Sequence, residues 1–240
     1  MSWNWTTLPR RVRLPETPRL ILTLGVAGLL SGLTIVGVYR ATLPIIRAND
    51  ARFLRQAGFE VVPGSEEMQR LVWEEDHLAP AAGVLGDEPS VYGAYDADGR
   101  FVGFAIPSEG PDFQDTIRLL YGFDPERGRI VGMSVLESRE TPGLGDRIYK
   151  DEVFVGRFRD LAVEPQVELV KEEPTAPNQV DAITGATISS AAVVTIIQKG
   201  NDRWLERLPE EAPPMGDAPQ EGGALTGDSD RGGPIPGGKS

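Results

Sequence analysis

The chain has 240 residues, of which 40% are hydrophobic, and its formal net charge at pH 7 is −12. It contains no cysteine and a single histidine, so iron–sulfur clusters, thiol chemistry and histidine-rich metal sites are excluded. A redox function would therefore need an organic cofactor, and a chain this acidic is not expected to bind the phosphate backbone of nucleic acids.

The first predicted element is a transmembrane helix. Residues 1–19 form a basic N-terminal segment, and the twenty residues from Leu20 to Tyr39 carry no charge. At about 1.5 Å per residue, a helix of this length spans the roughly 30 Å hydrocarbon core of a bilayer. A cleaved signal peptide is the alternative, but its apolar region is usually about 7–15 residues long and ends at a cleavage site, which is not apparent before Arg40. Arginines flank both sides of the span, so the positive-inside rule does not fix its orientation.

Residues 40–89 are expected to form a helical and irregular connector. The spacing of apolar residues over 42–57 predicts a helix that ends at Gly58. A short helix is expected over 66–71, after a Pro-Gly-Ser turn, and the remainder is rich in proline, glycine and acidic residues.

An antiparallel sheet is predicted after the connector. Four segments with strand-like composition form two expected hairpins, 91–95 with 101–106 and 116–123 with 130–136. Three glycines inside these segments mark bulges or the close approach of a ligand, or simply weaken the strands: Gly103, Gly122 and Gly132. Further on, a helix packed on the sheet is expected over 148–161 and a short strand over 167–170.

Two short motifs flank these last elements. The first is the turn-forming sequence Glu140-Thr141-Pro142-Gly143-Leu144-Gly145, which exposes backbone donors and acceptors to a ligand. The second is Asp181-x-x-Thr184-Gly185-Ala186-Thr187, directly before a run that predicts a helix over 188–208. Small residues and a hydroxyl at a helix N-terminus can hold a phosphate, because the unpaired backbone N–H groups and the helix dipole favour an anion. Taken singly, each motif also fits an ordinary turn or helix cap.

The two motifs together, in this order and about forty residues apart, resemble the FMN-binding domain shared by two related proteins. These are the G subunit of the Rnf-type ion-translocating oxidoreductase complex and the C subunit of sodium-translocating NADH:quinone oxidoreductase. The resemblance covers roughly residues 20–208. It implies an α+β fold in which the N-terminal transmembrane helix is followed by an FMN-binding domain over 90–208, with an antiparallel sheet and packed helices. The short stretch between anchor and strands is more similar to the Rnf G subunit.

The resemblance also implies a cofactor and its site. FMN would be attached as a phosphoester to Thr187 by a flavin transferase, which recognises Asp181, Thr184, Gly185 and Ala186. The first motif would lie against the isoalloxazine ring through Glu140, Thr141, Pro142, Gly143 and Leu144. No catalytic residue and no metal ligand are expected, because the flavin would relay electrons between neighbouring subunits.

By this resemblance the chain is an electron-transfer subunit of a multi-subunit translocase that couples electron flow between ferredoxin and NAD to ion movement. It would be a single-pass protein of the bacterial inner membrane with a periplasmic domain, in contact with membrane and redox subunits. The alternatives are the C subunit of the sodium-translocating enzyme, a stand-alone membrane-anchored flavin reductase or sensor, and an anchored domain without redox function. Residues 209–240 contain eight glycines and six prolines and are expected to form a disordered acidic tail.

Overall fold

The structure, a computed structural model, describes residues 16–81, 88–112, 116–138 and 145–215. Residues 1–49 and 50–240 form two separate compact units. The long helix α1 (Glu16–Val61) begins in the first unit and ends in the second.

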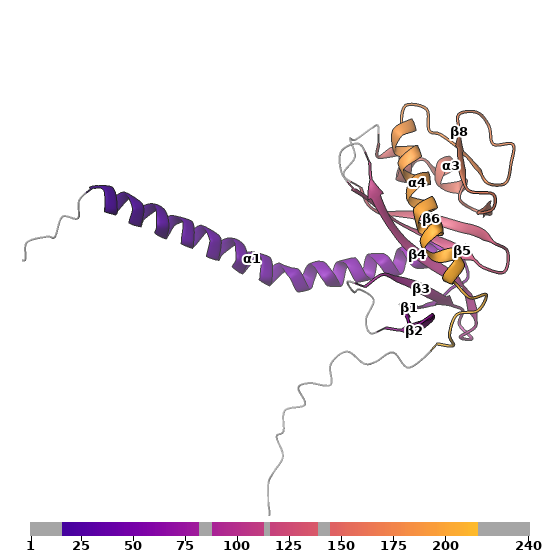
Figure 1. The fold of residues 1–240 in the computed structure, drawn as a ribbon, viewed down its shortest axis with the longest axis horizontal. Helices are drawn as coiled ribbons and strands as arrows, with labels where there is room; N and C mark the ends of the chain where they lie inside the picture. The colour runs from indigo at the N-terminus through magenta and orange to yellow at the C-terminus, as the bar shows by residue number, and fades with distance from the viewer. Residues whose placement is uncertain (1–15, 82–87, 113–115, 139–144, 216–240) are drawn as a thin grey trace, which may run out of the picture. The chain divides into compact units, whose positions relative to one another are not determined.

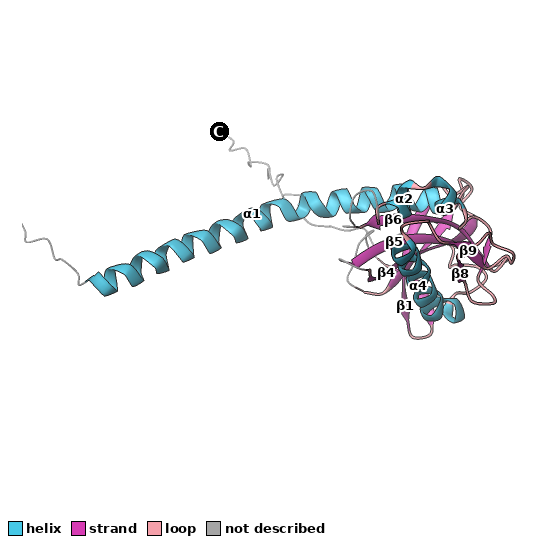
Figure 2. Ribbon diagram, turned by 90° about the horizontal axis from the view of Figure 1, so that it is seen from above, coloured by secondary structure: helices cyan, strands magenta, loops and turns pink. Residues whose placement is uncertain are grey.

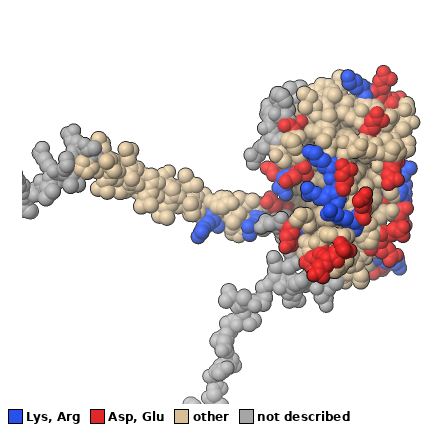
Figure 3. All heavy atoms as spheres, in the orientation of Figure 1, with Lys and Arg blue, Asp and Glu red and all other residues tan. Residues whose placement is uncertain are grey.

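α1 is long and apolar enough to cross a membrane. The large apolar side chains between residues 20 and 39 are exposed, and Figure 3 shows no charged side chain over most of this stretch. The hydroxyls of Thr23, Thr34 and Thr42 each donate a hydrogen bond to the carbonyl oxygen four residues earlier. Their polar groups are therefore satisfied within the helix, as an apolar environment requires. The helix runs without a break through 42–57 and ends at Val61, not at the predicted Gly58.

A seven-stranded antiparallel sheet forms the centre of the second unit (Figure 1). Its order is β2-β1-β3-β4-β5-β6-β7. The strands are β1 (Glu67–Glu74), β2 (His77–Pro80), β3 (Ser90–Tyr95), β4 (Phe101–Pro111), β5 (Thr116–Asp124), β6 (Arg129–Glu137) and β7 (Leu161–Ala162). A separate parallel pair is formed by β8 (Glu168–Val170) and β9 (Gln179–Asp181). The helices after the sheet are α2 (Arg147–Lys150), α3 (Glu152–Gly156) and α4 (Thr187–Trp204), followed by the 3-10 turn η1 (Leu205–Arg207).

The two predicted hairpins and the final helix are confirmed as β3–β4, β5–β6 and α4. The short helix expected over 66–71 is wrong, because these residues belong to β1 and pair with β3. The sheet therefore starts well before residue 90, inside the expected connector. The helix expected over 148–161 is also wrong in detail, since Asp151 separates α2 from α3 and its carboxylate accepts from the N–H groups of Val153 and Phe154.

The two faces of the sheet are covered by different helices. Adjacent residues such as Leu119 and Leu120 belong to different hydrophobic clusters, because side chains alternate between the faces of a strand. α4 covers the face that carries the larger cluster, and Figure 2 shows it on one side of the strands. The last turns of α1 cover the other face through Leu54, Ala57 and Val61.

Two glycines of the central strands allow the end of α1 to approach the sheet closely. A Cβ atom built on Gly122 would lie 2.0 Å from the carbonyl oxygen of Val61, and one on Gly132 would lie 2.7 Å from the same atom. The two glycines are partners in the register of β5 and β6. The sequence suggested a bulge or the approach of a ligand at these positions; a register shift does follow Gly122, but the group that approaches both glycines is the end of α1.

Part of the predicted disordered tail is ordered. Ala212 is 8% exposed and packs against the main core, and the carbonyl oxygen of Pro213 accepts a hydrogen bond from the hydroxyl of Tyr95. The expectation of disorder is thus wrong for residues 209–215. Residues 216–240 lie outside the described part of the chain.

Candidate functional site

The second motif forms a turn between β9 and α4. Asp181 is the last residue of β9, and the N–H of Ala182 donates to the carbonyl oxygen of Val170 at 2.8 Å. Gly185 has a φ of +85°, in the left-handed region that favours glycine. The N–H of Ala186 then donates to the carbonyl oxygen of Ile183 at 2.9 Å and closes the turn. We call residues 181–187 the acceptor loop, after the attachment of FMN that the sequence resemblance implies for Thr187.

Ser190 fixes the acceptor loop to α4. Its side chain is fully buried, and its Oγ accepts a hydrogen bond from the N–H of Ile183 at 3.1 Å. The same hydroxyl donates to the carbonyl oxygen of Ala186 at 2.9 Å. Both ends of the turn are thereby joined to the first turn of the helix.

Thr187 is the first residue of α4, and its side chain is exposed. The N-cap residue is Ala186, which makes no side-chain hydrogen bond to the helix. Thr187 is therefore not the N-cap residue of this helix, and the residue at that position makes no side-chain cap hydrogen bond. The first backbone N–H groups of this 18-residue helix can therefore bind an anion, and the Thr187 hydroxyl lies at the same end of the helix.

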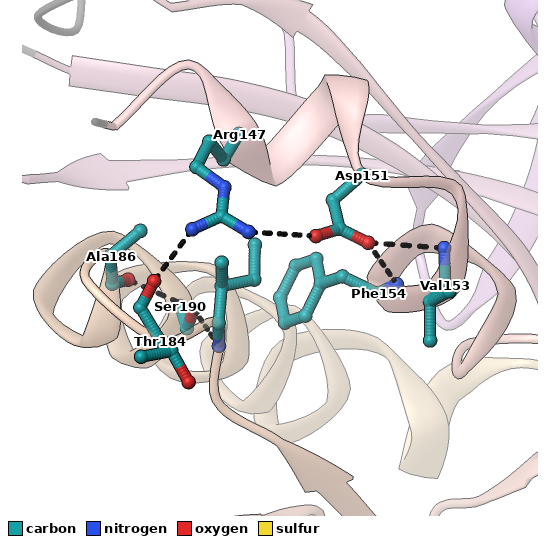
Figure 4. A network of polar contacts seen from close by, with 8 residues as sticks. Arg147, Asp151, Val153, Phe154, Thr184, Ala186 and Ser190 are labelled. Atoms are coloured by element: carbon teal, nitrogen blue, oxygen red, sulfur yellow. Dashed lines mark hydrogen bonds and ion pairs between the residues drawn. The ribbon is translucent and has the colours of Figure 1, made fainter. Parts of the chain in front are cut away.

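Arg147 reaches the acceptor loop from α2 (Figure 4). Its Nη1 donates a hydrogen bond of 2.6 Å to the carbonyl oxygen of Thr184, and its Nη2 contacts Asp151 Oδ2 at 3.2 Å. Asp151 is held in turn by the N–H groups of Val153 and Phe154 at the start of α3. The guanidinium thus lies between the acceptor loop and the carboxylate that caps α3.

Asp181, the first residue of the motif, forms an ion pair with Arg157. The Arg157 Nε and Asp181 Oδ1 atoms are 2.8 Å apart, and both are shielded from solvent. A second pair lies beside α2, where Asp146 contacts the Lys150 ammonium at 2.6 Å and raises the pKa of that lysine.

The three cations in and directly after α2 and α3 are all paired. Arg147, Lys150 and Arg157 each pair with a carboxylate. The negative charge of a phosphate at Thr187 would therefore be stabilised mainly by the N-terminus of α4, since Arg147, Lys150 and Arg157 already pair with carboxylates.

The predicted ring contacts Glu140, Thr141, Pro142, Gly143 and Leu144 lie outside the described residues. Two side chains next to undescribed segments carry shielded polar atoms with no hydrogen-bond partner among the described residues. These are the carboxylate of Asp112, after β4, and the hydroxyl of Ser138, after β6. A carboxylate can accept from the N3–H of an isoalloxazine ring and a hydroxyl can donate to its carbonyl oxygens. The orphaned groups therefore fit a flavin in their chemistry.

Sequence reasoning found the acceptor loop and missed the side chains that hold it. Thr184, Gly185 and Thr187 are exposed and Asp181 is partly buried, and all four lie in the one turn between β9 and α4. Ser190 could have been found from the sequence, because a serine in the first turn of a predicted helix can hydrogen-bond to the backbone of the preceding turn. Arg147 and Arg157 gave no signal, because their contacts depend on how distant segments pack.

Comparison with known proteins defines the class. The chain matches the FMN-binding domain family over residues 112–201. The crystal structure of Shewanella oneidensis NqrC superposes with a TM-score of 0.54 at 15% identity, and covers 66% of this chain and 97% of that one. That of the C subunit of Na(+)-translocating NADH-quinone reductase from Parabacteroides distasonis gives 0.53 at 20% identity, with 67% and 94% covered. The family match thus identifies an FMN-binding domain, and the structural neighbours agree with its α+β fold.

Sequence relatives identify the family within this class. The G subunit of the ion-translocating oxidoreductase complex is 30% identical over 187 residues in Methanosarcina acetivorans, covering 78% of this chain and 94% of that protein. The Haemophilus influenzae G subunit is 30% identical over 203 residues, covering 80% and 95%. The chain belongs to the family of G subunits of ion-translocating oxidoreductase complexes, and the expected preference for the G subunit over the C subunit is confirmed.

Proposed function

We propose that this chain is a membrane-anchored flavoprotein subunit that carries FMN as a phosphoester on Thr187. It relays electrons between neighbouring subunits of an ion-translocating oxidoreductase complex. The observation that carries the proposal is the exposed Thr187 hydroxyl at the N-terminus of α4, where the cap residue Ala186 has no capping side chain. Membership of the G-subunit family and the FMN-binding match support the same conclusion.

The residues of the acceptor loop have distinct roles in this proposal. Gly185 and Ala186 leave space beside the backbone, and the N–H groups at the start of α4 stabilise the phosphate charge. Asp181 and Thr184 complete the sequence that a flavin transferase recognises. Bound FMN supplies reversible electron transfer, and the protein fixes its position and tunes its potential. The residues from Glu140 to Leu144, together with Asp112 and Ser138, are proposed to contact the ring.

The proposal includes a location and partners. α1 crosses the bacterial inner membrane once, and the domain that follows faces the periplasm. Its partners are the other membrane and redox subunits of the complex and the flavin transferase. One relative, at 26% identity over 164 residues, is named as the G subunit of a proton-translocating ferredoxin:NAD(+) oxidoreductase complex from Clostridium ljungdahlii. We propose the same coupling of ferredoxin–NAD electron flow to ion movement here.

Substitution of Thr187 tests the attachment site. The protein is produced with a flavin transferase, and the flavin is detected by in-gel fluorescence after denaturing electrophoresis. We expect Thr187→Ala to remain folded but to lose the fluorescent band, because a phosphoester needs this hydroxyl. An exposed side chain that caps nothing contributes about 0.5 kcal/mol or less to stability.

Three variants serve as controls for this experiment. Thr184→Ser, Ser189→Ala and Thr195→Ala should each retain the fluorescent band, and the last removes an exposed threonine hydroxyl from the same helix. Fluorescence on the Thr187→Ala band, or FMN found by mass spectrometry on another residue, would refute the site. A wild-type protein without flavin would favour the anchored domain without redox function.

A further inference from the structure

Two arginines hold the acceptor loop at two points. Arg147, at the start of α2, donates to the carbonyl oxygen of Thr184 at 2.6 Å. Arg157, directly after α3, pairs with Asp181 at 2.8 Å. Both arginines belong to the segment 147–157, which follows closely after the first motif. We call the pair Arg147 and Arg157 the arginine clamp.

The segment that carries the arginine clamp is anchored in the core. Ile148 and Phe158 are fully buried and Phe154 is 3% exposed. The rings of Phe154 and Phe158 pack edge to face with their centroids 5.3 Å apart. Asp151 caps α3 with one carboxylate oxygen and contacts Arg147 with the other. The guanidinium groups therefore extend from a fixed base.

Both contacts of the clamp involve partly exposed side chains. Those of Arg157 and Asp181 are 37% and 30% exposed, although the two facing atoms, Nε and Oδ1, are themselves shielded from solvent. The Arg147 side chain is 41% exposed, and solvent weakens its ionic interaction to a similar extent. Its hydrogen bond to Thr184 is nevertheless charge-assisted, which makes it stronger than a neutral one.

The clamp joins the loop to a different part of the domain than Ser190 does. Ser190 connects the acceptor loop to α4. The clamp instead connects the loop to α2 and to the residue after α3. Only Gly185 and Ala186 separate the clamped Thr184 from Thr187. Fixing the Thr184 carbonyl therefore fixes the start of α4 relative to the segment that follows the first motif.

We propose that Arg147 and Arg157 are positioning residues of the flavin site, an inference that rests on the proposed attachment of FMN to Thr187. A flavin attached at one point has a flexible ribityl chain, so the place of its ring depends on where the tether begins. The clamp sets that starting point, and thereby determines how firmly the ring is held.

The test compares clamp variants with a matched control in the full-length, flavin-loaded protein in detergent. The variants are Arg147→Met, Arg157→Met and the double substitution. The control is Arg159→Met, which removes the same charge from an exposed position with no contact to the acceptor loop among the described residues. The readouts are covalent flavin content, flavin fluorescence anisotropy, midpoint potential and amide hydrogen exchange over 182–187.

In the clamp variants we expect lower flavin anisotropy and a shifted midpoint potential. We also expect amide exchange over 182–187 to be about tenfold faster, because loss of a charge-assisted hydrogen bond raises the equilibrium constant for local opening by roughly a factor of ten or more. The double variant should show the largest changes and Arg159→Met none. Arg147→Lys should restore part of the anisotropy. Lysine can donate to Thr184, but it lacks the planar fork that also reaches Asp151.

The possible outcomes separate the two proposals. Clamp variants that match Arg159→Met in anisotropy and potential would overturn the positioning role. Clamp variants that fold but lose covalent flavin, while Arg159→Met keeps it, would support the role, since a displaced Thr187 is no longer presented. A wild-type protein without flavin would refute the attachment proposal. If Arg157→Met does not fold, Arg147→Met decides, because its partly exposed side chain should be dispensable for folding.

Discussion

The hydroxyl of Tyr95 donates a hydrogen bond of 2.6 Å to the carbonyl oxygen of Pro213, 118 residues further along the chain. Tyr95 is 1% exposed and lies in β3, whereas Pro213 follows the last helical turn. Ala212, beside the acceptor, packs into the main core. The start of the C-terminal segment is therefore part of the folded domain.

Two truncations should distinguish the parts of this segment. Removal of residues 216–240 should leave the melting temperature unchanged, because their composition offers little apolar surface to bury. Removal of 209–240 should lower it, because Tyr95 loses its acceptor and a buried unpaired hydroxyl costs about 1–3 kcal/mol. Differential scanning calorimetry of the two proteins measures this. Equal melting temperatures would show that 209–215 does not stabilise the domain.

The same tyrosine predicts a dependence of stability on pH. Burial raises the pKa of Tyr95 to about 12 from its usual value of 10.0. The neutral hydroxyl is favoured in the folded state, so its contribution to stability is complete below pH 10.0 and is lost as the pH rises towards 12. Tyr95→Phe should be less stable than wild type at pH 8, and this deficit should shrink between about pH 10 and 12. Urea unfolding at several pH values gives the comparison, and a constant deficit would contradict the assignment.

Substitution of Gly122 should destabilise the domain through α1. Alanine there would bring a Cβ atom to 2.0 Å from the backbone of Val61, which cannot rotate away as a side chain can. We expect a loss of about 1–3 kcal/mol, or roughly 2–4 °C in melting temperature per kcal/mol. Gly156→Ala is the control, because nothing lies within 4 Å of its Cβ position. A Gly122→Ala protein as stable as this control would show that α1 does not pack here.

A pair of glycines with positive φ separates folding from flavin attachment. Gly185 in the acceptor loop has a φ of +85°, and Gly99 in the turn between β3 and β4 has a φ of +75°. A Cβ atom meets open space at both, so alanine would cost about 1–2 kcal/mol of backbone strain in each case. We expect similar melting temperatures, but a loss of covalent flavin only in Gly185→Ala. Equal flavin content in the two variants would show that the loop conformation is unimportant for attachment.

The central strands were predictable because alternating side chains serve two buried faces, and the turn at Asp96–Gly99 marks one hairpin clearly. β1 was missed because Met68, Leu71 and Val72 also have the spacing of an amphipathic helix. Pairing with β3 decides between the two, and that pairing is a long-range event which no local pattern records. The break at Asp151 is a case of a side chain that competes for backbone N–H groups.

In the candidate site, too, local sequence predicts one part and long-range packing determines the other. The acceptor loop carries its own signal, since Gly185 and the hydroxyls adjoin a helical run. The arginine clamp could not be predicted, because Arg147 and Thr184 are 37 residues apart and meet only after α2 and α4 have packed.

The burial of Val61 decides how a soluble form of this domain can be made. Residues 54–62 cover Tyr92, Ala94, Ala105 and Leu120. A protein that starts at Ser65, where the sheet is about to begin, would expose this apolar face to water and leave Gly122 and Gly132 uncovered. A protein that starts at Asp50 keeps the cover and omits the apolar span. The last turns of the helix thus belong to the folding unit of the domain, and any truncation for crystallisation or spectroscopy should be placed before them.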